Sequence, residues 1–343
     1  MKQPPQNDTL ADLAARTFDR IAEPISLIER ILHDQVSSDV QLVSAVGDHV
    51  VSAGGKRLRP ALVLLSAELC GYTGPRRLQI GAAVELLHTA TLLHDDVVDL
   101  SSLRRGRSSA NAIWGNRRAV LAGDFLYARA SAMMAEDGDP HLIEIFAATI
   151  GRMAEGELLQ LQSSFDLDIT ESNYFDVIDR KSAALLSAAC DSGAILGGVT
   201  RAERRRLASF GRDLGLAFQL KDDALDYDTQ AETLGKRQYA DLHEGKVTLP
   251  LLLTLKRCSS GEREQIAGLL KAAARHSEED PAAMEMDFSP IADLVATHRG
   301  VEDTLRRAAD HVDRCREALA VFPDGPARKA LLGAAQFAVA RDR

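Results

Sequence analysis

The sequence predicts an all-α protein, and three observations carry this prediction. Alanine and leucine dominate the composition, aromatic residues make up only 5% of the 343 residues, and charged residues, at 27%, recur between apolar residues at helical spacing. A sheet protein would show apolar residues in alternation and more aromatic and β-branched residues. The length permits a large core in one or two domains.

The first four helices follow from apolar periodicity and from glycine and proline breaks. We expect the first over about Leu10–Asp34 and the second over Asp39–Ser52, which Gly54-Gly55 terminates. Pro60 suits the first turn of a third helix, since its missing N–H would be unpaired there anyway. After a glycine- and proline-containing turn, a long helix is expected over Arg76–Leu100.

The later helices rest on the same periodicity. They are expected at Arg118–Glu136, Pro140–Phe165, Glu171–Leu196, Arg201–Tyr227, Leu249–Lys256, Gly261–Arg275, Pro290–Thr297, Gly300–Phe322 and Pro326–Ala340. The segment 104–109 is expected to be a loop, and the long irregular stretches are expected at Asp228–Thr248 and His276–Asp287.

Two acidic clusters stand out inside this helical pattern. Asp95-Asp96 with Asp99, and Asp222-Asp223 with Asp226, each place three carboxylates at i, i+1 and i+4. One such cluster alone is usually a solvated helix face. Both clusters here are flanked by apolar residues, where unpaired carboxylates are costly. Two like-charged clusters in that setting favour bound divalent cations, because hard cations prefer oxygen ligands.

The helix faces carry further polar residues in line with these clusters. His88, Thr91, Asp95 and Asp99 share one stripe of the fourth helix, and Gln219 lies on the same stripe as Asp222 and Asp226. Mg²⁺ tends to take one or two carboxylates, waters and substrate phosphate oxygens. A diphosphate ligand therefore fits the pattern.

Basic residues occur where such a ligand would need them, several of them next to glycines that allow close approach of an anion. They are Lys56, Arg59, Arg104, Arg105, Lys181, Lys236 and Lys246. Each alone is more often a solvated surface residue.

The whole-chain properties limit the function classes. The net charge of −9 argues against a nucleic-acid surface. The four scattered cysteines form no C-x-x-C pair, so reduced thiols are expected. The N-terminus is no signal peptide and no apolar run could span a bilayer. We expect a cytoplasmic protein whose product can still associate with membranes.

The motifs together resemble the trans-isoprenyl diphosphate synthase (polyprenyl synthetase) family over about residues 54–250. They are Gly-Gly-Lys-Arg-Leu-Arg-Pro at 54–60, Leu-Leu-His-Asp-Asp-Val-Val-Asp at 92–99, Arg-Arg-Gly at 104–106, Ala-Gly-Asp-Phe-Leu at 122–126, Gly-Glu-Leu-Leu-Gln-Leu at 156–161, Phe-Gln-Leu-Lys-Asp-Asp-Ala-Leu-Asp at 218–226 and Glu-Gly-Lys-Val-Thr-Leu-Pro at 244–250. Each motif alone is weak, and their joint order is specific.

The resemblance implies a fold and a metal site. The fold would be a single domain over residues 1–343, a bundle of antiparallel helices around one deep central cavity, with the two aspartate motifs facing each other across its mouth. Asp95, Asp99 and Asp222 would hold Mg²⁺, supported by Asp96, Asp223 and Asp226, and we count Asp226 among the metal ligands. Three Mg²⁺ ions bound with the substrate diphosphate are expected. A homodimer is also implied.

The resemblance also assigns two substrate sites. Arg104, Lys181, Ser182, Gln219, Lys236 and Lys246 would bind the allylic diphosphate. Isopentenyl diphosphate would be held by Lys56, Arg59, His88 and Arg105. Asp95, Asp96, Asp99, Arg104, Lys181, Asp222 and Asp223 would be the catalytic set. Ionisation of the allylic diphosphate would leave a carbocation that the double bond of isopentenyl diphosphate attacks, and the released diphosphate would remove the proton.

In this family a bulky aromatic residue four or five positions before the first aspartate limits the product length. Here those positions hold Thr91 and Ala90, with Leu87 one turn deeper, and no aromatic occurs between Gly74 and Leu103. We therefore expect a long product of eight to ten isoprene units, as in the side chains of quinones such as ubiquinone. A shorter-chain (geranylgeranyl or farnesyl) synthase is the alternative.

Two further readings stay open. A terpene cyclase also ionises a diphosphate, but the second acidic motif and the Lys56/Arg59 loop argue against it. A non-catalytic subunit of a heteromeric prenyl synthase could lose its acidic residues, and here both motifs are intact.

Overall fold

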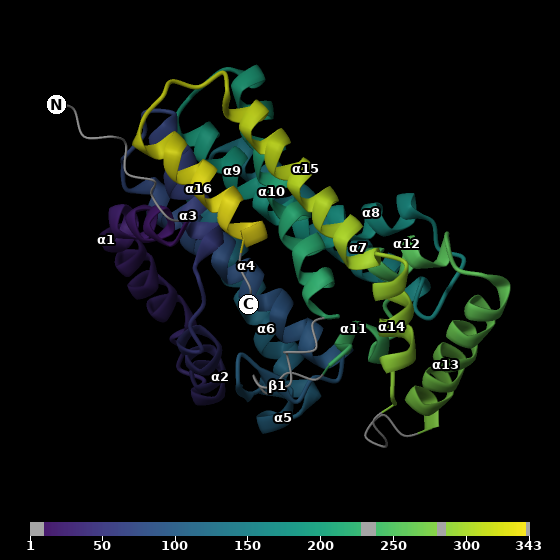
Figure 1. Ribbon diagram of the computed structural model, residues 1–343. Coiled ribbons are helices and arrows are strands. Elements are labelled where there is room, and N and C mark those ends of the chain that lie inside the picture. The colour runs from purple at the N-terminus through teal and green to yellow at the C-terminus, as the bar shows by residue number, and fades with distance from the viewer. Residues whose placement is uncertain (1–9, 228–237, 280–285, 341–343) are drawn as a thin grey trace. The chain divides into compact units, whose positions relative to one another are not determined.

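The structure is a computed structural model that describes residues 10–227, 238–279 and 286–340, and these residues are almost all helical (Figure 1). The helices are α1 (Leu10–Val36), α2 (Gln41–Ser52), α3 (Leu58–Leu69), α4 (Arg76–Val98), α5 (Ala110–Trp114), α6 (Asn116–Asp137), α7 (Pro140–Gln162), α8 (Glu171–Ile178), the π-helix η1 (Asp179–Ala183), α9 (Ala184–Leu196), α10 (Arg201–Leu225), α11 (Ala240–His243), α12 (Leu249–Leu255), α13 (Ser260–Glu279), α14 (Ser289–Thr297), α15 (Gly300–Leu319) and α16 (Pro326–Ala340). The predicted all-α class is confirmed.

Two local predictions were wrong. The loop expected at 104–109 belongs to a small hairpin, in which β1 (Leu103–Arg104) pairs antiparallel with β2 (Arg107–Ser108), and the short helix α5 follows it. The stretch expected to be irregular before Thr248 contains α11. The helical span expected over Glu171–Leu196 has these ends, and its middle, η1, is a π turn.

The described chain divides into two compact units. Unit 1 contains residues 10–148, 185–214 and 312–340, and unit 2 contains the described residues within 149–184 and 215–311. The expectation of a single domain over residues 1–343 therefore stays a prediction.

Helix α4 is the centre of unit 1, where it packs against α1, α3 and α6 (Figure 1). Its residues from Ile80 to Leu87 are all buried, so α4 has no solvated face over these two turns. A helix buried in this way is apolar on nearly all sides rather than amphipathic, and Glu85 is the one charged residue among these eight. The two ends of α4 differ, because its C-terminal turns carry the first acidic cluster.

The contact between α4 and α6 explains two of the sequence motifs. The ring of His94 lies directly over Gly123 of α6, where an added Cβ would come within 2.3 Å of its Nε2 atom. The same nitrogen is 3.1 Å from the carbonyl oxygen of Val120. His94 therefore fixes α4 to α6, and Gly123 is the residue that permits the close approach.

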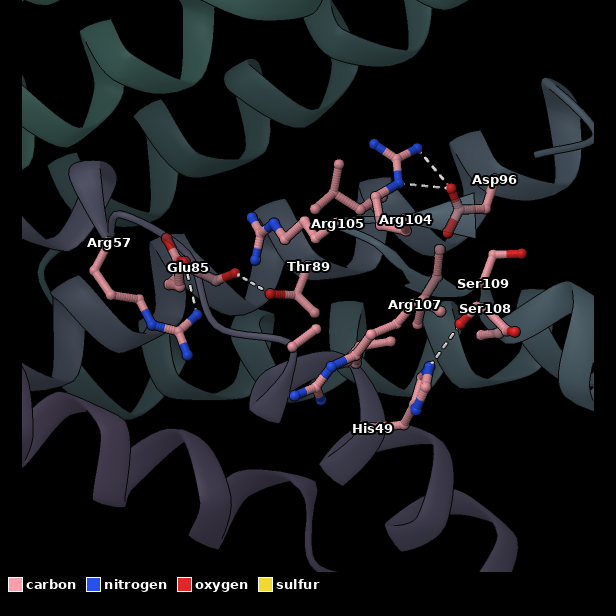
Figure 2. Close-up of a pocket in the computed structure, with 15 residues that line it drawn as sticks. His49, Arg57, Glu85, Thr89, Asp96, Arg104, Arg105, Arg107, Ser108 and Ser109 are labelled. Atoms are coloured by element: carbon pink, nitrogen blue, oxygen red, sulfur yellow. Dashed lines mark hydrogen bonds and ion pairs between the residues drawn. The ribbon is translucent and has the colours of Figure 1, made fainter. Parts of the chain in front are cut away.

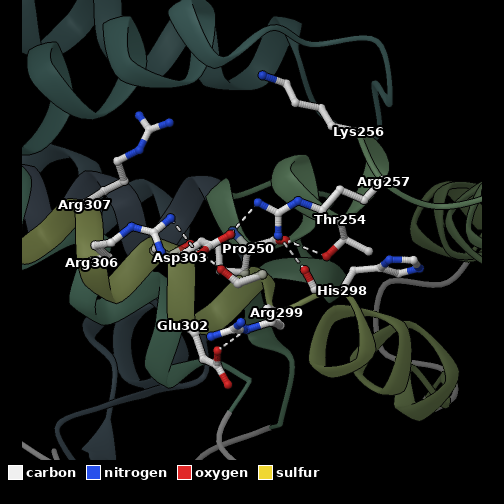
Figure 3. Close-up of polar contacts among 12 residues, drawn as sticks. Pro250, Thr254, Lys256, Arg257, His298, Arg299, Glu302, Asp303, Arg306 and Arg307 are labelled. Atoms are coloured by element: carbon white, nitrogen blue, oxygen red, sulfur yellow. Dashed lines mark hydrogen bonds and ion pairs between the residues drawn. The ribbon is translucent and has the colours of Figure 1, made fainter.

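In unit 2, a group of polar residues joins the end of α12 to the start of α15 (Figure 3). Arg257 donates to the carbonyl oxygen of His298 at 2.6 Å and also forms an ion pair with Asp303. Asp303 forms a second ion pair, with Arg306, at 2.7 Å. Gly300 packs against the backbone of α12, since an added Cβ would lie 2.2 Å from the oxygen of Pro250. These contacts hold α12 against the segment that follows α14.

No helix in the described part of the chain is both long enough and apolar enough to cross a bilayer. All four cysteines, Cys70, Cys190, Cys258 and Cys315, are free thiols in this structure.

Candidate active site

The loop between α2 and α3 has an unusual backbone that its glycines make possible. Gly54, Gly55 and Arg57 all have positive φ values, of 72°, 152° and 45°. An added Cβ at Gly55 would lie 2.7 Å from the Nη1 atom of Arg105, so the Arg105 guanidinium lies against this part of the loop. The positive φ is what favours glycine there. Lys56, between them, places its ammonium 4.8 Å from the centre of the Phe337 ring.

Unit 1 brings together four of the predicted substrate-binding residues, which are Arg59, His88, Arg104 and Arg105. Arg57 lies near them. Burial and the charges of Arg59, Arg105, Arg104 and Arg57 hold the pKa of His88 well below its ordinary value, so this imidazole is neutral. Burial lowers the pKa of Arg59 to about 10 and lowers that of Arg105. The result is a partly buried cationic surface with a neutral histidine beside it, which suits a polyanion.

The pocket shown in Figure 2 lies beside this surface, between α2, α4 and the hairpin. Its polar lining includes Arg57, Glu85, Arg104 and Arg105. His49 of α2 contacts the hairpin here, with its Nε2 atom 2.9 Å from the carbonyl oxygen of Ser108.

The first acidic cluster lies at the C-terminal end of α4. Asp95 is in the last turn, and Asp99 is the residue after the helix, with its N–H donating to the oxygen of Asp95 at 2.8 Å. Both are partly exposed. Asp96 is buried and accepts from Arg104 at 2.7 Å and 2.6 Å, so Arg104, predicted to bind the allylic diphosphate, is here held by the motif itself (Figure 2).

Burial raises the pKa of Asp96, while Arg104 opposes this rise. The pair thus reduces the cost of burying a carboxylate.

The three residues predicted to set product length line up along α4. Leu87 and Ala90 are fully buried, each with 1% of its surface exposed. Thr91 is partly exposed, and its hydroxyl donates to the backbone oxygen of His88 at 2.8 Å.

In unit 2, Lys181 and Ser182 lie in the π-helix η1. Glycines on two neighbouring helices give this wider helix its room. An added Cβ at Gly156 of α7 would lie 2.7 Å from the backbone nitrogen of Lys181, and one at Gly215 of α10 would lie 2.6 Å from the Cα of Ala183. Inserted π turns are common at functional sites.

The side chains of η1 connect to the second acidic cluster through hydrogen bonds. Ser182 donates to the Gln219 side chain at 2.7 Å, and Gln219 donates to Asp223 at 2.8 Å. Tyr174 of α8 donates to the other oxygen of Asp223 at 2.5 Å. Burial raises the pKa of Asp223 to about 7, partly offset by these hydrogen bonds.

Lys181 forms an ion pair with Glu157 at 2.7 Å, which holds its ammonium beside α7.

Asp226 sits just beyond α10 and binds the start of α11. It accepts from the backbone N–H groups of Ala240 at 3.0 Å and of Asp241 at 3.1 Å. Burial raises its pKa to about 6. Lys246 pairs with Glu244, and Asp222 is partly exposed on α10. Lys236 lies outside the described residues.

Tyr239 takes the left-handed conformation with φ of 53° directly before α11.

The donor set fits magnesium shared with a substrate. No three histidine, cysteine or carboxylate groups in residues 10–227, 238–279 and 286–340 come close enough to hold a metal by themselves. Mg²⁺ takes one or two protein carboxylates and completes its octahedron with water and phosphate oxygens, so such a site needs no third protein ligand. Burial is the main cause of the raised pKa values of Asp223 and Asp226, and the charge of Lys246 partly offsets it at Asp226.

The structure therefore assembles the predicted residues in two sets. Lys56, Arg59, His88, Arg104, Arg105 and the first acidic cluster belong to unit 1, while Lys181, Ser182, Gln219, Lys246 and the second cluster belong to unit 2. That the two clusters face each other stays a prediction.

Sequence reasoning missed Arg57, Glu85 and Tyr174. Arg57 stands within the Gly-Gly-Lys-Arg motif, and Glu85 is a charged residue inside an otherwise apolar run. Both could therefore have been recognised from the sequence. Nothing in the local sequence marks Tyr174.

Comparison with known proteins gives consistent results. The family model described as polyprenyl synthetase matches residues 40–286. Octaprenyl diphosphate synthase of Escherichia coli (strain K12) is 42% identical over 323 residues, which cover 94% of this chain and 97% of the relative.

Two solved structures are also similar. A polyprenyl synthase from Caulobacter crescentus CB15, complexed with calcium and isoprenyl diphosphate, is 40% identical with a TM-score of 0.88, covering 99% of this chain and 100% of that one. A decaprenyl diphosphate synthase from Rhodobacter capsulatus is 38% identical with a TM-score of 0.87, covering 96% and 99%.

Proposed function

Because this chain belongs to the polyprenyl synthetase family, we propose that it is a magnesium-dependent trans-prenyltransferase that condenses isopentenyl diphosphate repeatedly onto an allylic diphosphate. The observation that carries this proposal is the surface in unit 1 where Arg59, Arg105 and a neutral His88 lie near the acidic end of α4. The cationic residues of this surface can bind a diphosphate directly, and the nearby carboxylates can bind a diphosphate that carries metal ions.

The cationic residues of unit 1 bind the diphosphate of isopentenyl diphosphate. Guanidinium groups hold phosphate oxygens in a bidentate manner, and the neutral His88 can donate one hydrogen bond. Lys56 on the adjacent loop adds a point charge. These groups fix the substrate and leave its apolar end, with the reacting double bond, free to approach the allylic partner.

Asp95, Asp99 and Asp222, with Asp226, are the residues that would hold magnesium. When bound, the metal offsets the negative charge that develops on the departing diphosphate. The relative from Caulobacter crescentus, crystallised with calcium and isoprenyl diphosphate, supports a divalent cation at this kind of site. Three ions, as the family resemblance implies, are part of the proposal.

The chain's own residues complete the allylic site. Lys181, Ser182, Gln219, Arg104 and Lys246 orient the allylic diphosphate and stabilise its charge as the carbon–oxygen bond breaks, and Lys236 would add a further cation. Ser182 and Gln219 are already joined by a hydrogen bond and are thereby pre-oriented. Buried apolar residues such as Leu87 and Ala90 make this part of α4 apolar, which would help to keep water from the carbocation.

We infer a long-chain product of eight to ten isoprene units. The similar proteins from Escherichia coli and Rhodobacter capsulatus are named for octaprenyl and decaprenyl products. The absence of an aromatic side chain at Thr91, Ala90 and Leu87 supports the same inference.

A homodimer is proposed as well. Helix α6 exposes three large hydrophobic side chains, with 67% of Leu121, 39% of Tyr127 and 37% of Val120 accessible. A second copy of the chain could cover such side chains.

The test is incubation of the purified protein with Mg²⁺, farnesyl diphosphate and labelled isopentenyl diphosphate, followed by sizing of the product. All-trans polyprenyl diphosphates of eight to ten units support the proposal. Products of three or four units support the shorter-chain alternative. A cyclic hydrocarbon indicates a cyclase, and activity only with a second protein indicates a heteromeric enzyme.

A further inference from the structure

A buried ion pair between Arg57 and Glu85 lies under the cationic surface of unit 1. The Nη1 atom of Arg57 is 3.1 Å from Glu85 Oε1, and only 8% and 3% of the two side chains are exposed (Figure 2). Arg57 also donates to the backbone oxygen of Val51 at 2.9 Å and lies 3.4 Å from Glu29, which is 48% exposed. Neither Arg57 nor Glu85 belongs to the substrate-binding set described above.

A buried ion pair of this kind contributes little net stability to a fold. Burying two charges carries a large desolvation cost, and an apolar pair of similar volume often stabilises a fold as well or better. The second oxygen of Glu85, Oε2, is buried and makes no hydrogen bond with any described residue. An unsatisfied buried oxygen adds a further cost. The pair therefore calls for a role beyond stability.

The position of Glu85 supplies such a role. Its charge acts on Arg59 and on Arg105 as well as on Arg57, and in both cases it offsets the effect of burial on the guanidinium pKa. Arg59 has a buried Nε atom without a hydrogen-bond partner among the described residues. Arg105 lies across the backbone of Gly55. One carboxylate thus provides the counter-charge for three arginines that would otherwise repel one another.

We propose that Glu85 is a positioning residue, which, anchored by Arg57, holds Arg59 and Arg105 in a preformed arrangement for the diphosphate of isopentenyl diphosphate. This inference rests on the proposed function. A flexible arginine loses side-chain entropy when it binds a ligand, so fixing it beforehand improves affinity.

Glu85 also repels the incoming diphosphate, and the two effects oppose each other. Arg57 offsets part of this repulsion, because it pairs with Glu85 at 3.1 Å. The proposal requires the positioning of Arg59 and Arg105 to outweigh the remaining repulsion, so loss of the carboxylate is expected to weaken substrate binding.

The test is Glu85→Gln, with binding of isopentenyl diphosphate measured by calorimetry and KM measured for both substrates. We expect binding of isopentenyl diphosphate to weaken about tenfold or more, with a matching rise in its KM and little change in the KM of the allylic substrate. Equal or tighter binding by the folded variant would overturn the inference. Glu29→Gln, which removes only the exposed partner of Arg57, is the matched control and should bind as the wild type does.

A double variant separates positioning from simple structural support. Arg57→Met with Glu85→Met removes both charges and keeps apolar volume, so it should recover the melting temperature that Glu85→Gln loses. If Glu85 is a positioning residue, the double variant still binds isopentenyl diphosphate weakly. Recovery of both the melting temperature and the affinity would show a structural pair only. A wild-type protein without condensation activity would contradict the proposed function, whereas an active wild type with unaffected variants contradicts this inference alone.

Discussion

His88 shows how a single residue reports the charge around it. Burial and four arginines hold its pKa well below the ordinary value, so the folded protein keeps the ring neutral where the unfolded chain would protonate it. Below the ordinary pKa the unfolded state therefore binds one more proton than the folded state. The contribution of His88 to folding stability is therefore complete above the ordinary pKa. It is lost as the pH falls from that value through the lowered pKa of the folded state.

We predict that His88→Gln reduces the loss of unfolding free energy on acidification. Denaturant melts at pH 7.5 and 5.5 would measure it, and one proton accounts for at most about 1.4 kcal/mol per pH unit. His141, whose side chain is 61% exposed, provides the control substitution to glutamine. An unchanged acid slope in His88→Gln would mean that the ring titrates normally in the folded protein.

Ala90 is the residue on which product length should depend most. It is fully buried on α4, five positions before Asp95. We predict that Ala90→Phe shortens the main product by several isoprene units, because the ring would occupy the path of the growing chain. The variant will also lose stability, by about 1–3 kcal/mol, from overpacking.

Product sizing by chromatography checks this prediction. Gln79→Phe, at an exposed position near the start of α4, should leave the product unchanged. A full-length product from a folded Ala90→Phe enzyme would remove Ala90 from the chain path.

At the scale of elements, the π-helix η1 depends on glycines in its neighbours. We predict that Gly156→Ala destabilises the protein by about 1–3 kcal/mol, because the added Cβ would lie 2.7 Å from the nitrogen of Lys181. It should also raise the KM of the allylic substrate by displacing Lys181 and Ser182. Thermal melts and steady-state kinetics would measure both effects.

Gly151 gives a matched comparison, since it lies on α7 too and an added Cβ would meet nothing within 4 Å. Gly151→Ala should be neutral or stabilising by up to about 1 kcal/mol, because alanine favours helix. If both substitutions have the same effect, the close approach of α7 to η1 matters neither for stability nor for the KM of the allylic substrate.

The long helices could be predicted because apolar periodicity carries over many turns. Helix α16 was predicted with its observed ends, and α4 within two residues. The hairpin at 103–108 and η1 could not be predicted in this way. Two-residue strands are too short for a period, and the π turn depends on Gly156 and Gly215, which are distant in sequence. Tertiary packing decides such elements, not local propensity.

The residues of the candidate site also divide into those that the sequence reveals and those that only the fold reveals. The acidic clusters and arginines were identified because charge inside an apolar pattern is visible in the sequence. The partners that orient them were not visible. Tyr174, which holds Asp223, comes from a helix 49 positions away in the chain. Hydrogen bonds of this kind are a property of the fold.

At the scale of the whole molecule, the proposed function requires the two acidic clusters to act together. One cluster belongs to each unit, in a chain that carries a net charge of −9. Crowded carboxylates disfavour one another, and the binding of magnesium with diphosphate would remove that cost at both clusters. If they share one metal–diphosphate complex, their contributions to binding cannot be independent.

The most direct measurement is a double-mutant cycle for binding of inorganic pyrophosphate with Mg²⁺. Calorimetry would compare the wild type, Asp95→Asn, Asp222→Asn and the double variant. The account predicts that each single substitution removes most of the binding and that the double variant loses little more, a coupling well above the roughly 0.5 kcal/mol expected for independent sites. Losses that simply add, each variant keeping an undisturbed site at the other cluster, would contradict it.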